Sequence, residues 1–353
     1  MNALGYFGDY SGGLDPAQEQ VLVDPPAIPS WCENMMFTPY DPKTRIGMWL
    51  HLGSLPEAPE FWEDRVIMSL PDGEGVLSMW ATHKTPLERR PGGSNMSFRC
   101  IEPFRRWRVE FDGFVQHVSN ETMLSTLEQP VGRRKRLTIE LDIEHITPAW
   151  DVAAAAHAET GRGSMTDQGW AKEHYEQLYR ATGRVTWGER EWPFDGFGWR
   201  DHSRGPRVHD PRNPWGGHST AGLAFPSGKA VIFTRMWTTS GRITLEGAQV
   251  TSADGTIAPA RLIEPPRLTG LVGADERMMA RLEACGQPII LLMASDTILQ
   301  LSMQNQVAVG TDLSGSGLMY VINFGVAEWD GETGLFYIER SEHLSRPLLS
   351  VSP

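Results

Sequence analysis

The amino-acid sequence predicts an all-β protein with little helix, folded as two antiparallel β-barrels in tandem. Three observations support this fold class. Short apolar or alternating runs recur about every 10 to 15 residues, a spacing typical of antiparallel sheets that close on themselves. The 353 residues include 36 Gly and 25 Pro, which favour many turns over long helices. The second half of the chain repeats the first in kind.

Strand-like segments of the first half follow a non-periodic N-terminal stretch. The clearest hairpin signal joins residues 65–70 to 75–80 through a Pro-Asp-Gly turn. Residues 137–143 alternate between apolar and polar side chains, as a strand with one solvated face does. The other strand candidates of this half are 45–52, 96–101, 107–111 and 114–118.

The second half contains another clear hairpin, in which residues 220–225 and 229–237 flank a Pro-Ser-Gly turn. Before it, residues 181–187 are strand-like, whereas the composition of residues 170–179 favours a helix. The remaining strand candidates are 242–245, 248–251, 288–293, 297–303, 317–324 and 334–339.

The same pattern suggests where the domains begin and end. Residues 148–169 are Ala-rich and polar, as expected of a domain junction or of an excursion over a barrel mouth. We therefore expect an N-terminal arm at 1–28, a first barrel at 29–165 and a second barrel at 166–345.

Charge and composition exclude several classes of partner. The net charge of −12 disfavours binding to nucleic acid, and the short basic run at 133–136 is typical of a solvated turn. Three widely spaced Cys form neither a disulfide framework nor a paired-cysteine zinc motif. The sequence shows no signal peptide and no apolar run long enough to span a membrane. We expect a cytoplasmic protein that binds a small hydrophobic molecule, and a homodimer remains open.

The densest chemistry lies at residues 196–207, with the sequence Gly-Phe-Gly-Trp-Arg-Asp-His-Ser-Arg-Gly-Pro-Arg. On a regular strand Trp199, Asp201 and Ser203 share one face, and the intervening Arg200, His202 and Arg204 share the other. Adjacency therefore does not make Asp201 and His202 a hydrogen-bonded pair. If Asp201 faces an apolar cavity, burial raises its pKa and makes it a proton donor. Alternatively, this segment is a structural network of buried ion pairs.

Other catalytic or ligand-binding motifs are missing. The sequence has no phosphate-binding loop, no Gly-x-Ser-x-Gly elbow and no His-Glu-x-x-His zinc motif. His202, His209 and His218 could gather around a metal only through the tertiary fold. We therefore expect no metal and no cofactor. Tyr320, Asn323 and Glu328 are interpreted as packing and turn residues.

His174 lies 27 residues before Asp201 and is followed by Tyr175 and Glu176. If its strand pairs with the 196–207 segment, His174 and Asp201 could face one cavity. A hydrogen-bonded structural histidine is the alternative.

The 196–207 segment resembles the Asp-His signature of the carotenoid 1,2-hydratase (hydroxyneurosporene synthase) superfamily. Residues 33–37, 45–53 and 183–207 resemble a bacterial branch of that group. The resemblance implies two tandem lipocalin-like β-barrels. It also implies that Asp201 protonates an unactivated double bond, with His202 beside it and His174 as the upstream histidine. Trp199 stands where the hydratases have a tyrosine, Ser203 where they have an asparagine, and Glu176 where they have a tryptophan.

Together these observations predict a cofactor-independent lyase, such as a hydratase or dehydratase, acting on a hydrophobic aromatic or terpenoid substrate. Asp201, His174 and His202 are the expected catalytic residues. The expected substrate-binding residues are Trp199, Arg200, Tyr175 and Glu176, and Glu176 could act as a second acid or base. An isomerase or cyclase, or a non-catalytic carrier of an apolar ligand, are the alternatives.

Overall fold

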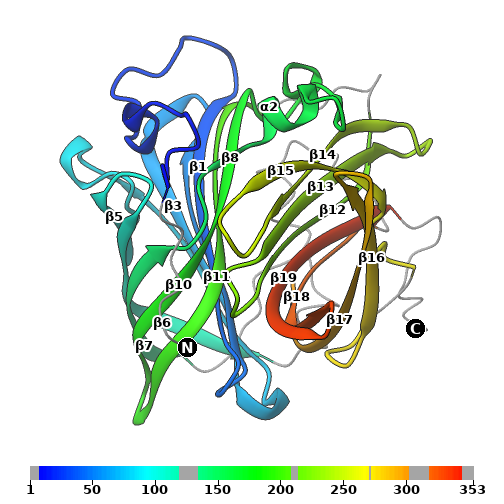
Figure 1. Ribbon diagram of the computed structural model, residues 1–353. Helices are drawn as coiled ribbons and strands as arrows, with labels where there is room; N and C mark the ends of the chain where they lie inside the picture. The colour runs from blue at the N-terminus through cyan, green and yellow to red at the C-terminus, as the bar shows by residue number, and fades with distance from the viewer. Residues whose placement is uncertain (1–7, 119–133, 208–213, 270–271, 302–317, 344–353) are drawn as a thin grey trace, which may run out of the picture.

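The structure, a computed structural model, describes residues 8–118, 134–207, 214–269, 272–301 and 318–343. Strands dominate, and they form two antiparallel sheets. Figure 1 shows the first sheet, coloured blue to green, beside the second, coloured yellow-green to red. Each sheet closes on itself, so the predicted all-β fold of two tandem lipocalin-like barrels is confirmed.

The first barrel is an eight-stranded meander. It closes because its last strand pairs with both its first strand and its seventh. Two short strands, β5 (Met96–Glu102) and β8 (Trp150–Asp151), extend it at β6 and β10. In order, the barrel strands are β1 (Trp31–Asp41), β2 (Ile46–Leu55), β3 (Ala58–Ser69), β4 (Val76–Lys84), β6 (Arg106–Val118), β7 (Arg134–His145), β10 (Glu173–Trp187) and β11 (Arg190–Pro206).

The second barrel repeats this topology with consecutive strands. It closes through the pairing of its first and last strands, and β9 (Arg162–Gly163) adds to β14. The strands are β12 (Trp215–Ala224), β13 (Ala230–Thr238), β14 (Ile243–Thr251), β15 (Ile257–Glu264), β16 (Arg277–Ala284), β17 (Gln287–Gln300), β18 (Leu318–Trp329) and β19 (Glu332–His343).

The boundary between the barrels differs from the expected one at 165–166. The β10–β11 hairpin, which carries the Asp-His segment, belongs to the first barrel because β10 pairs with β7 and β11 pairs with β1. The sheet boundary therefore lies between β11 and β12. The helix expected at 170–179 is also wrong, since β10 begins at Glu173 and pairs with β11 over its length. Pairing with both neighbours overrides the helical propensity of this segment.

The segment 148–169, expected to be a domain junction or an excursion, is an excursion, because β10 and β11 follow it and belong to the first sheet. It contains β8, which pairs with the first sheet, and β9, which pairs with the second. Between them lies α2 (Val152–His157), whose first turn is capped by the side chain of Asp151. The other helices of the described residues are the single turns η1 (Pro16–Glu19), η2 (Pro71–Gly73), η3 (Leu87–Arg89) and η4 (Met165–Asp167). In the described ranges, no helix is both long and apolar enough to cross a bilayer.

Strand alternation divides most of the buried apolar side chains of the described residues into three large cores, and two small clusters lie apart from them. Phe37 and Trp107 belong to the inward-facing core of the first barrel, and Leu223 and Phe233 to that of the second. A third core lies between the barrels and consists of side chains that point outward from each, such as Trp199. Each barrel interior therefore has its own apolar core, and a separate set of apolar side chains packs between the barrels.

Candidate functional site

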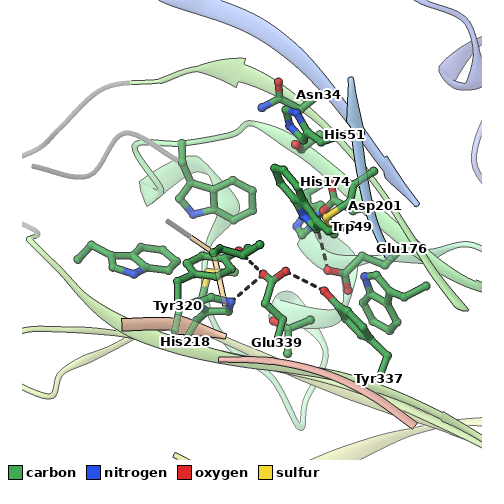
Figure 2. A pocket seen from close by; sticks show the side chains of 18 of the residues that line it. Asn34, Trp49, His51, His174, Glu176, Asp201, His218, Tyr320, Tyr337 and Glu339 are labelled. Atoms are coloured by element: carbon green, nitrogen blue, oxygen red, sulfur yellow. Dashed lines mark hydrogen bonds and ion pairs between the residues drawn. The ribbon is translucent and has the colours of Figure 1, made fainter. Parts of the chain in front are cut away.

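A cavity of about 90 Å³ lies at the interface between the barrels. Most of its lining residues lie on the first, second, seventh and eighth strands of each barrel, and a few lie beside these strands. Many of the lining side chains are aromatic, and three carboxylates and three imidazoles lie among them (Figure 2). The lining residues are Asn34, Met36, Trp49, His51, Trp170, His174, Glu176, Trp199, Asp201, Ser203, Arg207, Trp215, His218, Thr220, Met236, Leu301, Tyr320, Tyr337 and Glu339.

The two faces of β11 have different surroundings, as the alternation predicted. Trp199, Asp201 and Ser203 line the cavity. Arg200 and His202, by contrast, join a network on the opposite face of the strand. The predicted division of this segment between two faces is therefore confirmed, and only one face meets the cavity.

His174 lies between two carboxylates at the cavity wall. Antiparallel pairing of β10 with β11 places Glu176 directly opposite Asp201, and His174 follows on the same face of β10. His174 Nε2 is hydrogen-bonded to Asp201 Oδ2 and lies 3.2 Å from Glu176 Oε1. The side chains of His174 and Glu176 are only 3% exposed, and that of Asp201 is 18% exposed. One imidazole thus bridges both acids in a site with little water.

The three groups perturb one another strongly. Burial alone would lower the pKa of His174, but the charges of Asp201 and Glu176 raise it to about 10. Burial raises the pKa of Glu176 to about 7, although His174 partly offsets this effect. For Asp201, the attraction of His174 and Arg207 outweighs the effect of burial, so the pKa of Asp201 is lowered.

These directions correct one expectation from the sequence. Asp201 does not have the raised pKa of a proton donor; its neighbour Glu176 does. At neutral pH the arrangement is an imidazolium at His174, a carboxylate at Asp201 and a carboxyl at Glu176 that is close to its titration point.

The opposite face of β11 is a structural ion-pair network. Arg200 Nη1 donates to Glu19 Oε1 at 2.7 Å, and its guanidinium lies over the Trp107 ring at 4.5 Å. His202 Nε2 contacts Glu33 Oε1 at 2.8 Å, and its Nδ1 contacts the Tyr175 hydroxyl at 2.6 Å. Arg200, His202 and Tyr175, three residues predicted to take part in catalysis or substrate binding, therefore do not line the cavity.

Glu19 and Glu33 are partners that sequence reasoning missed. Glu19 ends the η1 turn, where Asp15 and Gln18 form a reciprocal capping box. Its carboxylate, 1% exposed, also accepts from the Trp107 indole at 3.0 Å. The capping pattern was a sequence signal for the η1 turn. Nothing in the local sequence indicates that the N-terminal arm places the Glu19 carboxylate next to β11.

A second polar group faces the first across the cavity. Glu339, on β19, accepts hydrogen bonds from the hydroxyls of Tyr320 and Tyr337, and its Oε1 lies 2.8 Å from His218 Nε2. Tyr337 also stacks on Trp199 of the first barrel, with ring centroids 5.4 Å apart. The cavity therefore brings together acids from both halves of the chain.

His174, Glu176 and Asp201 are also the one set of three potential metal ligands found among the described residues. Their ligand atoms lie within 4.8 Å of one another. However, His174 Nδ1 has no hydrogen-bond partner among the residues that the structure describes, whereas a metal-bound histidine ordinarily donates its second N–H to a neighbour. The same three groups can share protons instead, through the contacts of His174 Nε2 with both carboxylates. Of the three histidines considered from the sequence, His202 and His218 lie in separate networks, and His209 falls outside the described residues.

Comparisons with solved structures show the fold. An AttH candidate from Nitrosomonas europaea has a TM-score of 0.56 at 13% identity, over 92% of this chain and 99% of its own. CghA has a TM-score of 0.50 at 10% identity, over 96% and 97%. Kievitone hydratase from Nectria haematococca has a TM-score of 0.49 at 11% identity, over 92% and 91%.

No curated protein matches the sequence. A family model described as a domain of unknown function, DUF7064, matches residues 17–281, which include the whole first barrel and the first strands of the second. The chain therefore belongs to the DUF7064 family.

Proposed function

We propose that the cavity is the active site of a cofactor-independent lyase that removes water from, or adds water to, a hydrophobic substrate. One observation carries this proposal: a buried imidazolium is held between Asp201 and Glu176, and Glu176 has a pKa of about 7. A proton donor is most efficient when its pKa is close to the working pH. Asp201 is then the positioning residue that fixes His174.

In the dehydration direction, the Glu176 carboxyl gives its proton to the hydroxyl oxygen of the substrate. The C–O bond breaks with its electron pair, water leaves, and the adjacent carbon then loses a proton, so that the electrons of its C–H bond form the double bond. The new carboxylate of Glu176 is stabilised by the His174 imidazolium 3.2 Å away. Hydration is the reverse, in which the proton goes to a double-bond carbon and water attacks its neighbour.

Aromatic side chains support the positive charge that develops on carbon. Trp49, Trp199 and Tyr337 line the cavity beside the acids. The faces of such rings attract a cation by roughly 0.5 to 2 kcal/mol each. These aromatic rings would lower the barrier to C–O cleavage by stabilising the cation, without a metal.

The cavity size limits what reacts there. A volume of about 90 Å³ is smaller than an engineered cavity of roughly 150 Å³ that accommodates benzene. The described cavity therefore suits the reacting end of a molecule, such as a branched alcohol or alkene terminus, more than a whole terpenoid.

Heavy-oxygen exchange tests the proposal without knowledge of the natural substrate. The protein is incubated with tert-amyl alcohol or cumyl alcohol in labelled water, and the label entering the alcohol is measured by mass spectrometry. Glu176→Gln should lower the exchange rate by roughly 10² to 10⁴. Glu191→Gln, which alters an exposed glutamate elsewhere on β11, is the matched control and should leave the rate unchanged.

The same assay separates the proposal from its alternatives. Equal exchange in Glu176→Gln and wild type would show that Glu176 is not the acid. Failure of both alcohols to exchange, combined with a raised melting temperature in their presence, would instead identify a carrier of apolar ligands. Rearranged products without incorporated label would identify an isomerase or cyclase.

A further inference from the structure

The polar group of the second barrel has an ordered hydrogen-bond direction. The Trp215 indole N–H donates to Ser341 Oγ at 3.1 Å, and Ser341 Oγ lies 2.7 Å from His218 Nδ1. The Ser341 hydroxyl can therefore donate to His218 Nδ1, which leaves the proton of the ring on Nε2. That N–H points to Glu339 Oε1 at 2.8 Å. Glu339 is thus held by donors and is available as a proton acceptor.

This group stands at the same place in its barrel as the first group does in the other. His174 and Glu176 lie on the seventh strand of the first barrel and Asp201 on the eighth. Tyr320 and Glu339 lie on the seventh and eighth strands of the second. The two barrels therefore present equivalent strand pairs to one cavity (Figure 2).

The two groups also interact electrostatically. The charge of Glu339 contributes to the raised pKa of Glu176. Burial and the charge of Glu339, with smaller contributions from Asp201 and Glu176, raise the pKa of Tyr320 well above 10. Tyr320 therefore keeps its proton unless another proton replaces it.

We infer that Tyr320 and Glu339 form a second proton-transfer pair, which removes a proton from the carbon next to the one that loses its hydroxyl. The inference rests on the proposed lyase function and narrows the substrate class. The substrate would be an alcohol that carries hydrogen on the carbon adjacent to its carbinol carbon, and the product would be the corresponding alkene.

The step balances across the cavity. Glu176 gives one proton to the leaving hydroxyl, and water departs with the electrons of the C–O bond. The adjacent C–H bond breaks, and its electrons form the double bond. The released proton passes to the Tyr320 oxygen as the Tyr320 proton moves to Glu339. Tyr320 begins and ends neutral, Glu176 has lost one proton, and Glu339 has gained one, so exchange with water restores the site.

Deuterium uptake from heavy water isolates this second transfer. Cumyl alcohol and tert-amyl alcohol both carry hydrogen on a carbon beside the carbinol carbon. Deuterium enters that position only if a C–H bond is broken and remade. We expect wild type to incorporate both heavy oxygen and deuterium. Tyr320→Phe should lower deuterium uptake by roughly 10² or more while heavy-oxygen exchange stays within a few fold.

Matched variants guard against a trivial loss of structure. Tyr40→Phe removes another tyrosine–carboxylate hydrogen bond, to Asp296, at the barrel interface but outside the cavity lining, and should leave both exchanges unchanged. Glu339→Gln repeats the test at the acceptor and should also suppress deuterium uptake selectively.

Each other result overturns the inference in a recognisable way. Heavy-oxygen exchange without deuterium uptake in wild type would retain the proposed acid and remove the second pair. Normal deuterium uptake in both Tyr320→Phe and Glu339→Gln would place C–H cleavage elsewhere. Absence of both exchanges with either alcohol would overturn the inference together with the proposed function.

Discussion

Replacement of Glu176 by Gln should remove a pH-dependent penalty from the folded state. The pKa of Glu176 is about 7 in the native protein, compared with an ordinary value of 4.5. Because the native pKa is raised, the native state binds the proton more tightly than the unfolded chain does. The stability from this group is fully present below pH 4.5 and is lost as pH rises to 7. The loss amounts to about 3 kcal/mol, and the side chain is too buried for solvent to screen it.

Urea unfolding of wild type and Glu176→Gln at about pH 5 and pH 8 measures this difference. His174 remains protonated throughout that interval, since its pKa is about 10, so Glu176 is the group of this set that titrates there. The advantage of the Gln variant should grow by about 2.5 kcal/mol between the two values of pH, because part of the loss has already occurred at pH 5. The heavy-oxygen exchange of wild type should fall above pH 7 as the carboxyl loses its proton.

A constant stability difference between the two proteins at both values of pH would refute this reasoning. It would mean that Glu176 is already ionised at pH 5 and that its ion pair with His174 dominates over burial. Exchange that continues to rise above pH 7 would contradict the acid role for the same reason.

Three further predictions concern the framework of the site. Asp201→Asn should retain the fold, because the Asn side-chain oxygen can still accept from His174 Nε2, and lower heavy-oxygen exchange at least about 100-fold; melting and exchange measured together test this. Arg200→Met should leave Glu19 buried without its cation and cost about 3 to 5 kcal/mol in urea unfolding, with Arg190→Met as an exposed control. Gly222→Ala would bring a methyl group within 2.4 Å of Trp199, so we expect a loss of about 1 to 3 kcal/mol; an unchanged unfolding midpoint would show that the interface yields.

Local patterns were sufficient to predict many of the strands and the two faces of β11, but no strand candidate covered β1, β15 or β16. Alternation depends on side-chain geometry within one strand, so the division of Asp201 from His202 followed from the sequence alone. The barrel boundary did not follow, because it depends on which strands pair. The composition of 170–179 favoured a helix, yet β10 is held as a strand by β7 and β11 on its two sides.

The chemistry of the site was harder to predict for a related reason. The pKa of Glu176 is set by burial and by charges that include Glu339, which comes from the far end of the chain. Tyr320 was interpreted as a packing residue because no neighbour in sequence indicates that it faces a cavity. The pairing of His174 with Asp201 could be suggested, since both lie on what becomes one hairpin, but Glu19 and Glu33 could not be placed.

The sequence allowed two interpretations of the Asp-His segment, a catalytic site and a structural network of ion pairs. Each interpretation describes one face of β11. On the inward face, Arg200 and His202 are anchored by Glu19 and Glu33, next to the apolar core of the first barrel. On the outward face, Asp201 meets the second barrel, where close packing is interrupted by a cavity. Separating a buried ion pair costs several kcal/mol, because it leaves a buried charge without its partner. The inward network therefore holds β11 in register, and that register keeps the Asp201 carboxylate at the position where it orients His174.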